Sequence, residues 1–374
     1  MLTQRVRAQV DGLASSGLDV TTFSEAALSA LARAVPFSAA CFCTADPATG
    51  LVTSTVKCGL DSDHDDEWAH FEYTVPDHTA FLGLPSRPGG VLGVRDESPD
   101  GTGRSPRFTD FIQRYWNFGD ELRAAVSVDG RTWGYLALFR ETGFGASNEF
   151  SALDRGFVSG VGSSLANGLR SGLLAVAASG ASFVDGPAVI VVGADDEIAS
   201  TSVGAVERLA DLDEHRTGRA QLPLALLSLV GTARRNSDAG RPAVPRLRLR
   251  ARSGHWLVAH ASPLVGRDGG GTDVVITIEE ARPPDIVPLV VAAFGLTPRE
   301  QDVVGLVLQG VDTAAIGKAL HLSAYTVQDH LKSIFAKAGV RSRRELTSRV
   351  FYDQYAPRLA AGAGVGTGGW FSPA

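Results

Sequence analysis

The pattern of apolar and polar positions is most regular between residues 296 and 346. Apolar residues recur there at steps of three and four, which places them on one side of successive helices. The members of this pattern are Val303, Val307, Ile316, Leu320, Val327, Leu331, Ile334 and Phe335. A repeat of this kind predicts short amphipathic helices that each bury one face, and we expect four of them.

Polar caps and terminal glycines divide this segment into its four helices. Two of the expected starts carry a capping box, formed by Thr297 with Glu300 and by Ser342 with Glu345. The remaining caps and the helix-ending glycines follow the same logic: Asp312, Ser323, Gly310 and Gly339. A short second helix, a turn at residues 321–323 and a longer third helix form a helix-turn-helix arrangement.

The pattern before residue 175 predicts an α+β region built on an antiparallel sheet. We expect a helix over residues 23–35, strands over 38–44 and 51–59, and a loop-like segment over 86–105. The clearest signal is a hairpin over 122–140, because Asp129-Gly130 joins two strand-like runs. A helix over 147–174 follows.

Residues 186–282 begin a second α+β pattern. The expected strands are 188–192, 246–252, 256–263 and 273–279, and the expected helices are 202–212 and 222–234. A polar turn lies at 193–197 and a glycine-rich loop at 266–271. Residues 282–288 contain three prolines and predict a linker, and the glycine-rich end of the chain predicts a flexible tail.

Charge is distributed unevenly along the 374 residues, whose formal net charge is −6. Residues 296–352 hold eight Lys and Arg against five Asp and Glu, which gives +3 and leaves −9 for the remainder. A locally positive segment is what neutralisation of DNA phosphates requires.

The expected cellular compartment follows from the number of cysteines, the N-terminal sequence and the length of the longest apolar run. Three cysteines in a chain of this length give no disulfide framework, and the N-terminus has no apolar core typical of a signal peptide. The longest apolar run, residues 286–296, is too short to span a bilayer. We expect a cytoplasmic protein with no membrane partner.

Three groups of residues allow a second interpretation. Cys41, Cys43 and Cys58 fall on neighbouring strands and are expected to be core cysteines rather than a metal or redox site. The acidic, histidine-containing stretch at 61–78 is expected to be a solvated helix face or loop rather than a metal site. Arginines at every second position of 246–252 share one strand face. This face is either solvated and paired with carboxylates, or docked on the acidic N-terminal half or on an anion.

The helical segment resembles the LuxR-type helix-turn-helix domain of bacterial transcription regulators. The residues that carry the resemblance are Leu296, Thr297, Pro298, Arg299, Glu300, Gly310, Ile316, Leu320, Leu322, Ser323, Thr326, Val327, His330, Ile334, Lys337, Gly339, Val340, Ser342 and Arg343. The sequence departs from the family pattern at Gly317, Ala338, Gln328 and Asp329, so base preference does not follow from the resemblance.

This resemblance implies a partner and a set of contacting residues. Double-stranded DNA is the expected partner, bound as operator half-sites by a homodimer. By resemblance and by position on the third helix, the expected DNA-binding residues are Lys318, Ser323, Tyr325, Thr326, Gln328, Asp329, Lys332, Lys337, Arg341 and Arg343. We expect no cofactor, no metal site and no enzymatic activity.

The element order of the two N-terminal regions is similar to that of sensory domains. Residues 1–175 resemble a GAF domain with a terminal helix, and residues 180–282 resemble a PAS domain. The predicted fold class is therefore two α+β antiparallel-sheet sensory domains followed by an all-α four-helix helix-turn-helix domain. Its expected boundaries are a linker at 283–288, the DNA-binding domain at 289–356 and the tail at 357–374.

The resulting hypothesis is a DNA-binding transcription regulator whose N-terminal domains sense a ligand or a partner. Two alternatives remain. In the first alternative, the chain is a GAF/PAS ligand-binding or protein-interaction protein in which DNA contact is secondary. In the second, it is a regulator whose N-terminal half binds only a protein partner. The sequence contains no GxxxxGK[ST] motif, which excludes the ATPase-bearing LuxR-like regulators.

Overall fold

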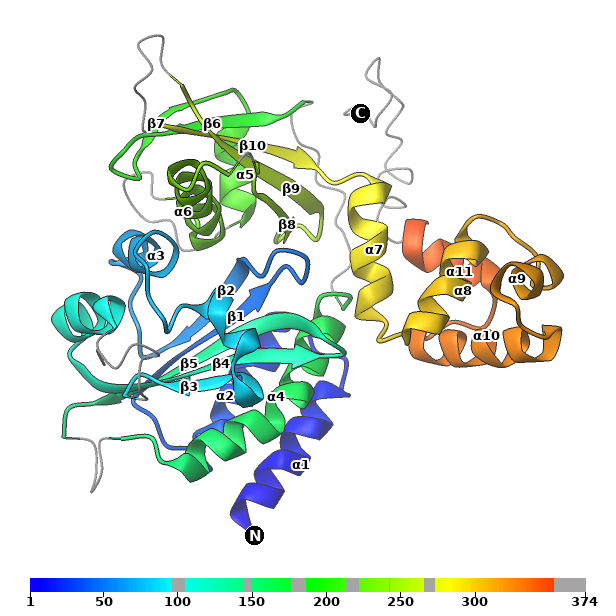
Figure 1. Cartoon of the computed structure of the whole chain (residues 1–374), viewed down its shortest axis with the longest axis horizontal. Coiled ribbons are helices and arrows are strands. Elements are labelled where there is room, and N and C mark those ends of the chain that lie inside the picture. The colour runs from blue at the N-terminus through cyan, green and yellow to red at the C-terminus, as the bar shows by residue number, and fades with distance from the viewer. Residues whose placement is uncertain are drawn as a thin grey trace. The chain divides into compact units, whose positions relative to one another are not determined.

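The computed structural model describes residues 1–95, 105–143, 149–175, 186–212, 222–241, 243–265 and 273–352. One compact unit contains residues 1–175, 186–252 and 257–280, and the second contains the segment from residue 281 onward. Figure 1 shows two sheets with their helices and a separate group of short helices. The predicted glycine-rich loop at 266–271 and the tail at 357–374 lie outside the described residues.

The first sheet has five antiparallel strands in the order β2-β1-β5-β4-β3. Its strands are β1 (Ala39–Ala45), β2 (Val52–Cys58), β3 (Val91–Gly93), β4 (Phe118–Val128) and β5 (Arg131–Glu141). The helical elements around it are α1 (Leu2–Ala14), α2 (Val20–Leu31), α3 (Asp65–Tyr73), η1 (Phe81–Ser86), η2 (Pro88–Gly90), η3 (Arg107–Trp116) and α4 (Ala152–Gly172). The predicted strands and hairpin are confirmed.

The hairpin between β4 and β5 closes as its dipeptide predicts. Asp129 and Gly130 both have positive φ, 52° and 71°, which a two-residue turn of this handedness requires. The long strands on either side of this turn are buried along most of their length. This hairpin therefore forms the middle of the sheet and fixes the register of its neighbours.

Helices α2 and α4 pack together through a glycine. A Cβ atom at Gly168 would clash with the Phe23 ring, so only glycine allows this approach. The predicted helices at 23–35 and 147–174 are thus confirmed, with starts at Val20 and Ala152. Helix α1 was not predicted, because only Val6 and Val10 of its residues are buried and two positions give no visible period.

The acidic stretch at 61–78 contains helix α3, one of the two alternatives we expected. One side of the helix is buried through Trp68, Glu72 and Tyr73 rather than fully solvated. Within the described part of the chain, no group of three or more His, Cys, Asp or Glu side chains is placed to hold a metal ion.

The cysteine prediction is confirmed at two of three positions. Cys41 and Cys43 are buried on β1, and their sulfur atoms lie 3.2 Å apart. Cys58 is exposed, because it ends β2, which is an edge strand of the sheet.

The second sheet has the order β7-β6-β10-β9-β8. When the strands of each sheet are counted in chain order, both sheets have the same arrangement: second, first, fifth, fourth, third. Its strands are β6 (Ala188–Val192), β7 (Ile198–Thr201), β8 (Arg246–Arg250), β9 (Trp256–Pro263) and β10 (Val274–Glu280), and its helices are α5 (Ala205–Leu212) and α6 (Leu224–Asp238). Every predicted element is present. Strand β7 was not predicted, since it is short and mostly exposed.

The arginine face of β8 is not simply solvated. Arg248 is 8% exposed, and its Nε donates to Oδ2 of Asp46 at 2.9 Å while its backbone N–H donates to the same oxygen at 3.1 Å. Asp46 follows β1 of the first sheet and is 3% exposed. The alternative in which this strand docks on the N-terminal half is therefore correct for Arg248. Arg246 and Arg250 are half-buried, and Arg252 is exposed.

The second unit is helical. It contains α7 (Pro283–Ala293), α8 (Pro298–Leu308), α9 (Thr313–Leu320), α10 (Ala324–Ala338), α11 (Arg343–Thr347) and η4 (Ser348–Tyr352). We predicted a linker over residues 283–288, and the chain is helical there instead. Two prolines fit the first positions of a helix, and the side chain of Asp285 accepts a hydrogen bond from the N–H of Arg282.

No helix among the described segments is long and apolar enough to cross a membrane.

We predict that removing the charge of Asp46 destabilises the fold. Asp46→Asn keeps an acceptor for the N–H of Ala48 but removes the negative charge from the buried ion pair with Arg248, which costs about 2–3 kcal/mol. The urea midpoint of the full chain should fall accordingly. Adding Arg248→Met should recover part of the loss. Additive effects of Asp46→Asn and Arg248→Met would contradict this coupling.

Candidate DNA-binding interface

The turn between α9 and α10 has the backbone geometry of a helix-turn-helix. Helix α9 ends at Leu320, and the next residue, His321, has a φ of 55° that turns the chain. Ser323 then caps α10 by accepting a hydrogen bond from the N–H of Thr326 at 3.0 Å. Asp312 caps the start of α9 in the same way. All the predicted caps are present. The second capping box differs in one detail, because Glu345 accepts the N–H of Arg341 rather than that of Ser342.

The buried side of these helices is the one that the three- and four-residue spacing predicts. Most of the predicted apolar residues are no more than 5% exposed: Val303, Val307, Ile316, Val327, Leu331 and Ile334. Leu320 and Phe335 are half-buried at the rim of this core. The core fixes the orientation of α10 and thereby determines which residues of that helix face outward.

Helix α10 presents one outward row of four side chains. Tyr325, Gln328, Asp329 and Lys332 follow at steps of three and four, so they share a face, and all four are exposed. Tyr325 is 75% exposed and the side chain of Lys332 is 76% exposed. Lys332 Nζ lies 3.4 Å from Oδ1 of Asp329, an exposed pair that a competing phosphate can replace at little cost.

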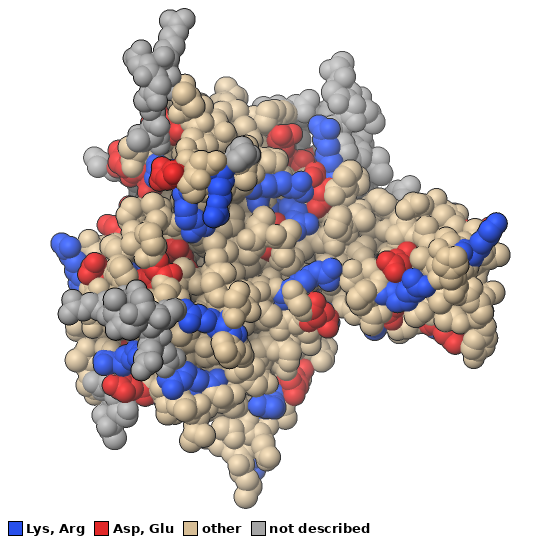
Figure 2. Space-filling view, viewed as in Figure 1, with Lys and Arg blue, Asp and Glu red and all other residues tan. Residues whose placement is uncertain are grey.

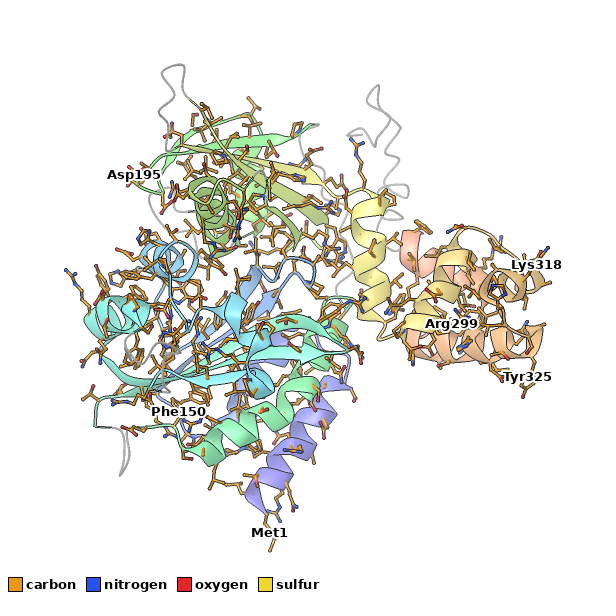
Figure 3. All side chains as sticks on the ribbon, viewed as in Figure 1. Met1, Phe150, Asp195, Arg299, Lys318 and Tyr325 are labelled. Carbon is orange, nitrogen blue, oxygen red and sulfur yellow. The ribbon has the colours of Figure 1, made fainter. Side chains whose placement is uncertain are left out.

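Other predicted residues lie around the start of this row. Lys318 on α9 is exposed, Ser323 is exposed at the turn, and Thr326 is half-buried with its hydroxyl 2.8 Å from that of Ser323. Figure 3 shows Lys318 and Tyr325 at the same end of the helical group. The structure therefore brings seven of the ten predicted residues together.

Lys337 and Arg343 are engaged inside the helical unit. The ammonium group of Lys337 donates to Oε2 of Glu300 at 2.7 Å. The guanidinium of Arg343 donates to the carbonyl of Val311 at 2.7 Å and to the hydroxyl of Thr313 at 3.0 Å. Arg341, the tenth residue, is exposed beside them. Arg344 is also exposed on α11 and was not singled out, since nothing in its spacing separates it from its neighbours.

Glu300 is the polar centre of this unit. It is 4% exposed, and in addition to Lys337 it accepts hydrogen bonds from the N–H of Thr297 and the hydroxyl of Ser333. Burial raises the pKa of its carboxyl, but these three donors more than offset that effect and lower the pKa to about 2. Sequence reasoning identified Glu300 only as a helix cap.

The outer surface carries both signs of charge. On the face seen in Figure 2, the helical group shows Lys and Arg interspersed with Asp and Glu. That face of the helical group therefore shows no patch of a single sign of charge.

Residues 295–350 match the family model described as "Bacterial regulatory proteins, luxR family". The chain is 43% identical over 56 residues to the monoamine regulon transcriptional regulator of Klebsiella aerogenes, a match that covers 15% of this chain and 25% of that protein. It is 49% identical over 51 residues to a protein of Mycobacterium tuberculosis described as an HTH-type transcriptional regulator, covering 14% of this chain and 6% of that one. The similarity thus spans a quarter or less of these relatives' length. It shows a LuxR-family helix-turn-helix domain at residues 295–350.

A solved structure of the VqmA dimer of Vibrio cholerae, whose description concerns LuxR-type receptors, aligns with 47% of this chain and 87% of that one at 16% identity. The TM-score is 0.23. A likeness at this level does not support an argument about fold or function.

We predict that the two lysines of α10 differ in their effect on stability. Lys337→Met removes a charged donor from the buried Glu300 and should lower the free energy of unfolding of the helical unit by about 2 kcal/mol. Lys332→Met, on the same helix, should change it by less than about 0.5 kcal/mol because its pair is exposed. Urea denaturation of the full chain, followed by far-UV circular dichroism, measures both. Equal effects would show that Glu300 does not depend on Lys337.

Glu300 should also make the helical unit sensitive to acid. Its pKa is lowered from 4.5 to about 2 in the folded chain, so its stabilisation is present above pH 4.5 and is lost as the pH falls toward 2. We expect about 1–2 kcal/mol, since Lys337 is partly exposed and water screens the pair. The stability difference between the wild type and Glu300→Gln should shrink over this pH range. A difference that stays constant down to pH 2 would contradict the assignment.

Proposed function

We propose that the chain is a DNA-binding transcription regulator in which α10 enters the major groove. The observation that carries the proposal is the single exposed row of Tyr325, Gln328, Asp329 and Lys332 on the second helix of a LuxR-family helix-turn-helix. A buried core holds the opposite side of this helix, so the row is rigidly presented. Rigid presentation of three or four side chains is what base readout in a groove requires.

The chemistry of the row suggests that some residues contact bases and others contact phosphates. Gln328 can form paired hydrogen bonds with adenine, and Asp329 can accept from the amino group of cytosine. We propose that phosphates around the helix start are contacted by Lys332, Lys318, Ser323, Thr326 and Tyr325. Lys337 and Arg343 already have partners within the unit, so we assign them first to positioning α10 and α11.

We propose that the chain acts as a homodimer on paired half-sites. One helix of 15 residues contacts few base pairs, and two copies on a two-fold site double the contact. Light scattering of the free protein and of the complex tests this, and a monomer in both states would refute it.

The two α+β regions are proposed to receive the signal. They belong to a different compact unit from the helix-turn-helix, and the sequence outside residues 296–352 has a net charge of −9, which does not favour contact with phosphates. A ligand or protein partner that binds one arrangement better than another would shift DNA binding by that difference in affinity. The second candidate, a ligand-binding or interaction protein with only secondary DNA contact, predicts no sequence preference in DNA binding.

We predict that two substitutions on the row affect DNA binding differently. One changes the affinity for all sequences, and the other changes the preference at one base pair. The full chain first selects its preferred duplex from a random-sequence library, and the affinity is then measured over a range of salt concentrations. Lys332→Ala should weaken binding to all sequences and reduce the salt slope by about one. Gln328→Ala should leave the slope unchanged and relax preference at one base pair by about 1–3 kcal/mol. No selected sequence, or no effect of either change, would overturn the proposal.

A further inference from the structure

Two buried thiols lie side by side on an inner strand of the first sheet. Cys41 and Cys43 are two positions apart on β1, so both side chains point to the same face of the sheet. Their sulfur atoms lie 3.2 Å apart, and the residues are 7% and 0% exposed. The sequence predicts small core cysteines at these positions, but packing alone does not require their sulfur atoms to touch. This contact gives the pair a chemistry that two separate thiols lack.

The neighbouring strand β2 places polar groups beside the pair. Thr55 lies opposite Cys43, and its hydroxyl donates to the Cys43 sulfur at 3.5 Å. Lys57 lies opposite Cys41 on the same face. A hydroxyl donor and a cation beside a thiol favour the thiolate, which is the reactive form of cysteine. The ion pair of Lys57 with Asp65 weakens its effect, so Thr55 is the main contribution from β2.

The hydrogen bond between the two sulfur atoms divides their acidity. The S–H of Cys41 donates to Cys43 and lowers the pKa of the Cys43 thiol, although burial acts in the opposite direction. The same hydrogen bond raises the pKa of the Cys41 thiol. The pair therefore loses one proton readily and keeps the other between two sulfur atoms in contact, so either sulfur can carry the negative charge.

Cys41 is the member of the pair that a very small molecule can reach. It lines a cavity between the first sheet and the helices that cover it. This cavity is partly open to solvent and has room for about one molecule of the size of water. Hydrogen peroxide is close to that size, whereas aromatic thiol reagents are far larger. Cys58 is exposed at the end of β2, where reagents of both sizes reach it.

The strand geometry permits a bridge between Cys41 and Cys43 but not to Cys58. A strand rises by about 3.3 Å per residue, so Cα atoms two positions apart are separated by about 6.6 Å, which a disulfide can span. Cys58 lies opposite Ala40 in the register of β1 and β2. It therefore points to the other face of the sheet from the two buried thiols.

We propose that Cys41 and Cys43 form a redox site that reduces hydrogen peroxide and closes a disulfide within β1. The Cys41 thiolate attacks one peroxide oxygen, the O–O bond breaks, and the departing hydroxide takes the proton of Cys43 and becomes water. The Cys43 thiolate then attacks the sulfur of the Cys41 sulfenic acid. The S–S bond forms as the S–O bond breaks, and the second hydroxide is protonated by solvent. The two sulfur atoms lose two electrons, and the peroxide becomes two molecules of water.

Tryptic peptides distinguish this disulfide from every other one the chain can form. Trypsin cuts after Arg33 and Lys57, so Cys41 and Cys43 share peptide 34–57, and Cys58 begins the next peptide. The folded full chain is treated with hydrogen peroxide and then unfolded with iodoacetamide, and the peptides are weighed. We expect peptide 34–57 to lose two hydrogen atoms and to regain them when dithiothreitol is added first. An aromatic disulfide reagent should modify only Cys58 in the folded chain.

Two variants separate the pair from its surroundings. Cys58→Ser leaves both buried thiols in place and should oxidise as the wild type does. Thr55→Val keeps a β-branched side chain of similar size and removes the hydroxyl that donates to Cys43. It should slow the oxidation about threefold at neutral pH, and the difference should vanish at alkaline pH, where the thiolate forms without this donor. Circular dichroism checks that both variants are folded.

Four results would overturn the site. They are no reaction of the folded chain, addition of oxygen to peptide 34–57 without loss of hydrogen, a disulfide that links this peptide to the Cys58 peptide, and a Thr55→Val rate equal to that of the wild type at neutral pH. The experiment uses no DNA, so its outcome is independent of the proposed function.

Discussion

The carboxylate of Glu300 is the point on which the helix-turn-helix geometry depends. It closes the start of α8 through Thr297 and ties that helix to α10 through Ser333 and Lys337. A buried charge is stable only when its lone pairs are satisfied, and these donors come from two helices that must lie at one distance and angle. This constraint fixes the direction in which the outward row of α10 points, because the donors lie on the inner side of that helix and the row lies on its outer side.

Much of the fold could be predicted because its signals are local. The Asp129-Gly130 hairpin and the caps at Thr297, Asp312 and Ser323 each involve residues at most a few positions apart, and the structure confirms them. Helix α7 was missed because its prolines indicate a linker when taken without tertiary context, although two of them suit a helix start. Helix α1 was missed because two buried valines are too few to reveal a period.

For the candidate site, the spacing of residues along the sequence predicts which helix they share but not which partners they have. Lys332 and Lys337 look alike in the sequence, both basic and both on the third helix of the segment. Their difference comes from Glu300, which lies on another helix and closes on only one of them. The buried charges of the first unit show the same limit: Arg248 bonds to Asp46 across two sheets, and Glu121 pairs with Arg107. Partners at such separations are set by packing, which no local pattern records.

The bond between Asp46 and Arg248 bears on how this protein can be recombined. The two α+β regions share a strand order and would seem interchangeable parts, yet each buries a charge whose counter-ion belongs to the other. In a chimera that joins the first region to a foreign second region, the buried carboxylate of Asp46 would lack its Arg248 partner. The two α+β regions are therefore not separate modules, and an exchange of this part of the chain must move residues 1–280 together.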